Sequence, residues 1–125
     1  MTKLAPSILS ADFCTLGEDI RQIEAGGADY VHIDVMDGIF VPNISIGIPV
    51  VKSVRKHTQM FLDVHLMIEH PNNLIHLFLK NLRKGDTVYI HPEAEYHPST
   101  TLQKIIDAGM VPGIAINPGT SVETV

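Results

Sequence analysis

Cysteine is nearly absent from this sequence, since Cys14 is the only one in 125 residues. A lone thiol excludes an intramolecular disulfide, so the fold must be held by its core, and low cysteine content fits a reducing compartment. Long apolar runs are missing too, and none approaches the ~20 residues that a membrane span requires. The N-terminus lacks the apolar stretch and cleavage site of a secretory signal. We therefore expect a cytoplasmic protein with no membrane partner.

Basic residues are also scarce, with nine Lys and Arg against fourteen Asp and Glu and a net charge of -5. Nucleic-acid binders usually carry a basic patch, so nucleic acid is not an expected partner. Backbone amides could still hold a small anionic ligand. The 45% hydrophobic content is enough for one core, and we expect residues 1–125 to form a single domain.

Short apolar segments alternate with amphipathic ones roughly every 25 to 30 residues, about the length of one βαβ step. Strands are predicted at residues 4–9, 30–36, 61–68, 87–91 and 111–117. Helices are predicted between them, beginning near Leu16, at Pro49, at Pro71 and at Ser99. Strict alternation of this kind predicts a parallel sheet, either open and doubly wound or closed into a barrel.

Two of the predicted strands alternate polar and apolar residues with period two, which places alternate side chains on one face. His32, Asp34 and Met36 share a face of the first strand, and Asp63, His65 and Met67 share a face of the second. Two imidazoles and a carboxylate suit a divalent ion such as zinc or iron, and a carboxylate beside such an ion can move protons. The pattern therefore predicts metal-assisted proton transfer.

The same pattern favours the barrel. Central strands of an open doubly wound sheet tend to be apolar on both faces, whereas these strands are apolar on one face only. Reactive residues of α/β barrels cluster at the C-terminal ends of strands, where Asp34, Met36, His65 and Met67 lie. A complete (β/α)8 TIM barrel has ~250 residues. We therefore expect a partial α/β barrel of about five parallel strands and four helices.

Several motifs identify a family. The sequence closely resembles ribulose-phosphate 3-epimerases in segments that follow the family's order and spacing. These segments are LAPSILSADF at 4–13, HIDVMDGIFVPN at 32–43, DVHLMI at 63–68, HPEA at 91–94 and GIAINPGT at 113–120.

The resemblance implies a TIM-barrel isomerase that interconverts D-ribulose 5-phosphate and D-xylulose 5-phosphate in the pentose phosphate pathway and the Calvin cycle. It implies a divalent metal, commonly zinc or iron, with manganese or cobalt as alternatives, that stabilises an enediolate. His32, Asp34 and His65 would be the metal ligands, and Asp34 would also be a catalytic proton carrier. Ser7 and His65 would contact the sugar phosphate, while Met36 and Met67 would lie over the reacting carbons.

In this family the second catalytic aspartate and the phosphate-binding backbone belong to later strands, for which the 125 residues contain no counterpart. A truncated, catalytically silent metal-binding or assembly fragment is therefore an alternative, as is an epimerase for a related ketohexose 6-phosphate. Half a barrel would expose sheet edges, which favours a homo-oligomer. His91 and Glu93 admit two interpretations, either a group that orients metal ligands or a simple turn at Pro92.

Overall fold

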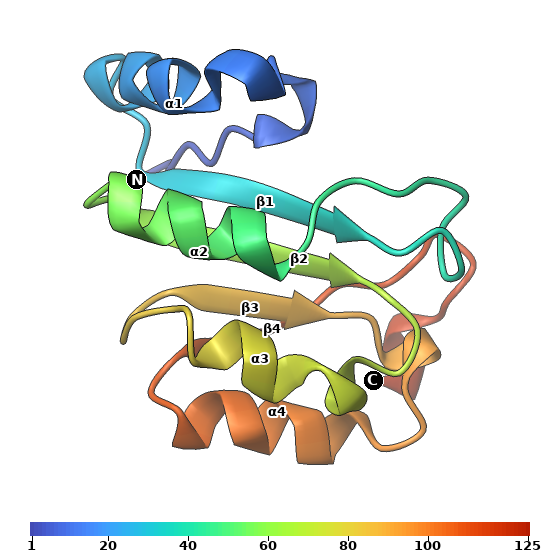
Figure 1. Ribbon diagram of the computed structural model, residues 1–125. Helices are drawn as coiled ribbons and strands as arrows, with labels where there is room; N and C mark the ends of the chain where they lie inside the picture. Colours follow the sequence, from blue (N-terminus) through green and yellow to red (C-terminus); the bar gives the residue numbers. More distant parts are fainter.

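The computed structural model describes residues 1–125 and contains one four-stranded parallel sheet with the order β1-β2-β3-β4. The strands lie side by side in chain order (Figure 1). Their bounds are β1 Tyr30–Met36, β2 Phe61–Met67, β3 Thr87–Ile90 and β4 Val111–Ile114. The expected parallel α/β architecture is therefore confirmed.

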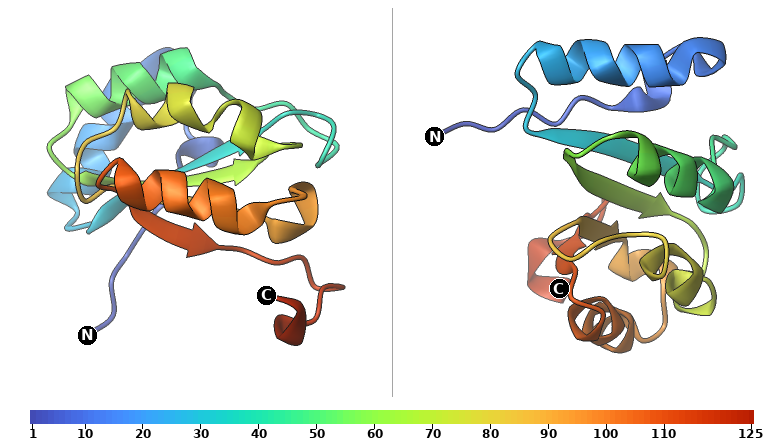
Figure 2. Two further views of the ribbon diagram at one scale, coloured as in Figure 1. Left: turned by 90° about the horizontal axis from the view of Figure 1, so that it is seen from below. Right: turned by 60° about the vertical axis from the view of Figure 1, so that its left-hand side comes forward.

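Four α-helices connect and cover the strands: α1 Leu16–Ala25, α2 Ile48–His57, α3 Ile75–Leu79 and α4 Pro98–Asp107. Figures 1 and 2 show α2, α3 and α4 on the same side of the sheet, with α1 beyond the β1 edge. None of the four is long and apolar enough to cross a membrane.

The core lies between the sheet and these helices. Strand side chains such as Val31, Ile33 and Leu66 are fully buried, and each helix contributes apolar side chains to the same cluster. Along β1, buried residues alternate with partly exposed ones, as the period-two pattern predicts. His32 and Asp34 occupy the partly exposed positions, so they lie on the sheet face away from the helices.

The prediction of a first strand at residues 4–9 is wrong, and the sheet has four strands instead of about five. The carbonyls of Leu4 and Pro6 accept hydrogen bonds from the backbone N–H groups of Tyr30 and His32, but only an isolated parallel bridge at Ser7 forms. Pro6 has no N–H to donate to a ladder. The Ser7 side chain then caps a 3-10 turn, which ends the extended segment.

Two other predicted elements are shorter in the structure. The helix predicted from Pro71 begins as a 3-10 turn, Pro71–Asn73, and the α-helix α3 occupies only Ile75–Leu79. Consecutive asparagines weaken the first turn, because their side chains compete for backbone hydrogen bonds. The strand predicted at 111–117 ends at Ile114, before the turn that contains Pro118.

Candidate active site

The register of β1 against β2 brings the predicted site residues together in cross-strand pairs. Paired residues of parallel strands share a sheet face, so these side chains form three layers on the face opposite the helices. From the start of the strands toward their C-terminal ends, the pairs are His32 with Asp63, Asp34 with His65, and Met36 with Met67.

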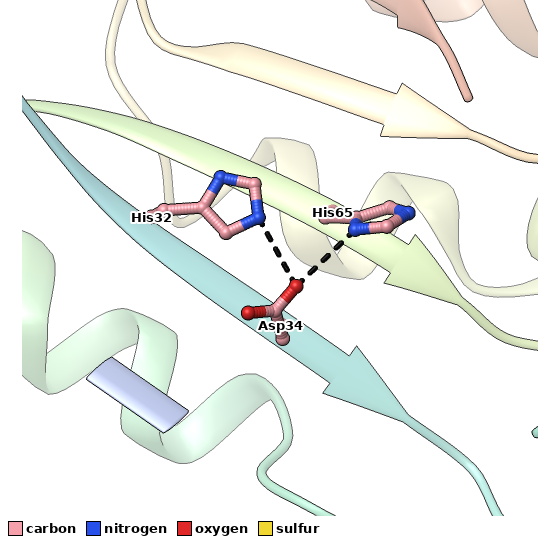
Figure 3. A group of neighbouring side chains, drawn as sticks. All are labelled: His32, Asp34 and His65. Carbon is pink, nitrogen blue, oxygen red and sulfur yellow. Dashed lines mark hydrogen bonds and ion pairs between the residues drawn. The ribbon is translucent and has the colours of Figure 1, made fainter. Parts of the chain in front are cut away.

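His32, Asp34 and His65 converge in the middle of this face (Figure 3). The His32 Nε2 atom lies 3.0 Å from Asp34 Oδ1, and His65 Nδ1 lies 3.2 Å from the same oxygen. One ligand atom from each residue can be chosen so that all three lie within 4.8 Å of one another. The three side chains are about one-eighth to one-fifth exposed, so the group is accessible from one side.

This donor set fits a divalent metal ion. Ligand atoms about 2.0 to 2.1 Å from a tetrahedral zinc lie roughly 3.3 Å from one another, close to the 3.0 and 3.2 Å separations seen here. Two imidazoles and one carboxylate also leave further coordination positions for water or substrate, as catalytic sites require. The chemistry of the donors suits zinc or iron and does not choose between them.

Asp63 supports His32 from the other side of its ring. Its Oδ2 atom lies 2.6 Å from His32 Nδ1, and Asp63 is buried. Hydrogen bonds to Asp34 and then to Asp63 raise the pKa of His32 to about 9, against the opposing effect of burial. A carboxylate that holds Nδ1–H leaves Nε2 directed at Asp34, which is the orientation of a metal-binding histidine.

The two oxygens of Asp34 have separate partners. Oδ1 faces the two histidines, whereas Oδ2 accepts a hydrogen bond from the Ser7 hydroxyl. Partial burial is the largest influence on Asp34 and opposes its ionisation, but the hydrogen bonds from His32, His65 and Ser7 together hold its pKa below the ordinary value. Asp34 is therefore a carboxylate at neutral pH.

A second polar chain leads away from His65. Its Nε2 atom lies 2.7 Å from His91 Nε2, and His91 Nδ1 lies 2.8 Å from Glu93 Oε1. His91 is buried, and the Phe40 ring packs on it with a centroid distance of 5.0 Å. Of the two interpretations of His91 and Glu93, the turn is present as the 3-10 helix Pro92–Ala94, and His91 also contacts His65, one of the predicted metal ligands.

A family model described as the ribulose-phosphate 3 epimerase family matches residues 3–125. The chain belongs to the ribulose-phosphate 3-epimerase family. It is 50% identical to proteins named ribulose-phosphate 3-epimerase from Bacillus subtilis, over 125 residues, and Rhodobacter capsulatus, over 123 residues. It is 41% identical over 125 residues to the protein of that name from Methanocaldococcus jannaschii.

The chain spans about half the length of the curated relatives it matches. The matches cover 100%, 98% and 100% of this chain, but 57%, 53% and 52% of the Bacillus, Rhodobacter and Methanocaldococcus proteins. The chain therefore corresponds to a four-stranded portion of the family's TIM barrel.

Within this epimerase-family fold, the remaining predicted residues lie around the group formed by His32, Asp34 and His65. Ser7 contacts Asp34 directly and also accepts a hydrogen bond from the Leu9 backbone N–H. Met36 and Met67 form the last layer at the C-terminal end of the two strands, and Met67 is buried. Their contacts with a substrate stay predictions.

The sequence interpretation gave Asp63 no role, although the structure places it against His32. The period-two pattern already put Asp63 on the same face as His65, but its partner could be identified only from the register between strands. If the two strands had been aligned in parallel with Asp34 opposite His65, His32 would have fallen opposite Asp63.

Proposed function

We propose that this chain provides the metal-binding and first proton-transfer part of a ribulose-phosphate 3-epimerase site. Such a site interconverts D-ribulose 5-phosphate and D-xylulose 5-phosphate by removing the proton from carbon 3 and returning one on the opposite face. The observation that carries the proposal is the convergence of His32, Asp34 and His65 on one side of the sheet, within a chain that matches the epimerase family from residue 3 to residue 125.

Asp34 is the proposed proton carrier. It is a carboxylate at neutral pH, and its Oδ2 atom faces Ser7 instead of the histidines, so one oxygen is available for the substrate side while the other belongs to the metal site. A divalent ion held by the three residues, with zinc or iron preferred, would stabilise the negative charge that develops on the substrate oxygen as carbon 3 loses its proton. Removal of a proton from a carbon next to a carbonyl needs both a base that takes the proton and a group that stabilises the negative charge on the oxygen.

Ser7, Met36, Met67 and His65 would bind the sugar phosphate. The Ser7 hydroxyl adjoins the Asp34 oxygen that would take the proton, so it can orient that oxygen or a substrate hydroxyl. Met36 and Met67 pair across the two strands next to the Asp34 layer. Their thioethers would give the reacting carbons an apolar surface that excludes water.

Inversion at carbon 3 also needs a proton carrier on the opposite face of the substrate, because one carboxylate can serve only one face. We assign that second role to no residue of the four strands. The proposal for this chain therefore covers the metal site and the Asp34 step.

Exchange of the carbon 3 proton of ribulose 5-phosphate for solvent deuterium, followed by NMR with zinc-loaded or iron-loaded chain, tests the Asp34 step, and a coupled assay of xylulose 5-phosphate formation tests complete epimerisation. Asp34→Asn should abolish the exchange, while Asp107→Asn, which removes the same charge from the exposed side of α4, should leave it unchanged. Metal bound one to one without exchange would favour the alternative of a metal-binding or assembly fragment. Faster turnover of a ketohexose 6-phosphate would move the proposal to that substrate.

We also propose a cytoplasmic location and self-association. A rice relative with 42% identity over 123 residues is named a cytoplasmic isoform of the epimerase. On β4, Val111 and Ile114 at the sheet edge are 48% and 44% exposed, which supports association through that edge. A monomeric mass in light scattering would refute self-association.

A further inference from the structure

We propose that Glu93 and His91 position the metal ligand His65 through a hydrogen-bonded chain, and that this chain strengthens metal binding. The inference rests on the proposed metal site. It adds two positioning residues to that site, neither of which contacts the three metal-binding side chains except through His65 Nε2.

The direction of the hydrogen bonds follows from the chemistry of the groups. A carboxylate can only accept, so the 2.8 Å contact between His91 Nδ1 and Glu93 Oε1 requires the proton on Nδ1. A neutral His91 then has its lone pair on Nε2, which accepts from His65 Nε2–H at 2.7 Å. Without a metal ion, the 3.2 Å contact of His65 Nδ1 with Asp34 Oδ1 is a hydrogen bond donated to the carboxylate. A bound ion would displace that Nδ1 proton, and because Nε2 keeps its proton for His91, the lone pair of His65 would then lie on Nδ1. Glu93 therefore selects the tautomer of His65 that can bind a metal.

The surroundings hold this chain in place. His91 is 5% exposed. Its ring lies nearly parallel to the His65 ring, edge to edge, with the centroids 4.9 Å apart, and Phe40 packs on it at 5.0 Å. The second oxygen of Glu93 accepts a hydrogen bond from the Thr120 hydroxyl and lies 3.4 Å from the Asn117 backbone nitrogen. Glu93 is therefore fixed from two sides, and the segment after β4 is joined to the metal site through it.

The other metal-binding histidine, His32, also has a carboxylate partner. Asp63 holds Nδ1 of His32 as Glu93 holds Nδ1 of His91, but Asp63 acts directly, whereas Glu93 acts through one further imidazole. Carboxylate partners of metal-binding histidines typically contribute 10-fold to 100-fold to metal affinity. We expect a contribution in this range from Glu93.

Titration of the full chain with Co²⁺, followed by its visible absorption bands, tests the inference. Glu93→Gln keeps the size of the side chain but gives an amide that no longer enforces a proton on His91 Nδ1. His91→Phe keeps an aromatic ring against Phe40 and removes both nitrogens. Glu95→Gln is the matched control, because it removes an equal charge from the same loop, where Glu95 accepts from the Asn72 backbone N–H and does not contact His91.

Glu93→Gln and His91→Phe should each weaken Co²⁺ binding 10-fold to 100-fold and alter the absorption bands, while Glu95→Gln stays within twofold of wild type. Because the two residues act in series, the double variant should bind no more weakly than His91→Phe alone. Unchanged affinity in Glu93→Gln, or losses that multiply in the double variant, would overturn the positioning role alone. A wild-type chain that bound no Co²⁺ would overturn the metal site itself and the positioning role with it.

Discussion

The buried ion pair between Arg55 and Asp86 gives the sharpest prediction for stability. Asp86 is fully buried, and Arg55 donates from Nη1 to both of its oxygens at 2.7 and 3.0 Å. The same carboxylate accepts backbone N–H groups of Leu62 at 2.9 Å and Arg83 at 2.9 Å. It therefore joins the C-terminal turn of α2 to the beginnings of β2 and β3. The perturbation is Asp86→Asn, which keeps the shape of the side chain.

The expected loss follows from these contacts. An asparagine has one acceptor oxygen, so its NH₂ group must face either the Leu62 or the Arg83 N–H, and Arg55, whose side chain is 10% exposed, loses its countercharge. Breaking a buried pair from one side costs about 3 to 5 kcal/mol. For a chain of this length that loss corresponds to a melting temperature lower by roughly 10 to 25 °C.

Urea denaturation monitored by circular dichroism measures the loss, with Asp107→Asn as the control on an exposed aspartate. The control should change the free energy of unfolding by less than about 0.5 kcal/mol. Asp86 directly precedes β3, at the opposite end of the sheet from the contact between His65 and His91, so the Co²⁺ affinity of folded Asp86→Asn should match wild type. A decrease in the free energy of unfolding of less than about 1 kcal/mol would refute the prediction that the buried Arg55–Asp86 ion pair stabilises the fold.

Three further predictions concern the site face. The pKa of His32 is about 9 in the folded state, above its ordinary value of 6.5, so protonated His32 stabilises the folded state by up to about 3 kcal/mol. This contribution is complete below pH 6.5 and is lost as the pH rises through 9. Denaturation with a chelator present should show this slope, and His32→Gln should flatten it. Gly113→Ala would place a Cβ atom 2.2 Å from the Tyr89 ring, so unfolding experiments should show a loss of about 1 to 3 kcal/mol. Asp37→Ala removes the acceptor of three backbone N–H groups, and hydrogen exchange at those amides should accelerate if that carboxylate orders the loop.

The period-two pattern was sufficient to predict the sheet faces. Val31, Ile33 and Val35 are buried beneath the helices, and the alternate positions carry His32 and Asp34, because side-chain direction in a strand depends only on parity. Parity also placed the two strands' polar residues on a common face once a parallel sheet was assumed. The convergence of His32, Asp34 and His65 could therefore be predicted without knowing any distance.

The predicted first strand shows where local pattern fails. Residues 4–9 are apolar enough for a strand, but strand formation depends on a continuous ladder with a neighbour, and Pro6 interrupts the ladder while Ser7 begins a turn. The sequence shows both residues. It does not show that this segment would form only isolated hydrogen bonds with β1, because strand pairing depends on the tertiary structure.

The sequence predicted no partner for His32, and it offered His91 and Glu93 only as one of two interpretations without naming the histidine that they contact. His32 and Asp63 are 31 residues apart in sequence, as are His65 and Asp34, and His91 reaches His65 across 26 positions. Each of these contacts depends on which residues of neighbouring strands stand opposite each other, and one residue of slippage would turn every partner to the other face. Asp86 lies where β2 and β3 begin, and its hydrogen bond from the Leu62 N–H joins these two strands at that end. Because His65 lies on β2 and His91 directly follows β3, the alignment that Asp86 supports at the N-terminal end of these strands is also the alignment on which the His65–His91 contact near their C-terminal ends depends.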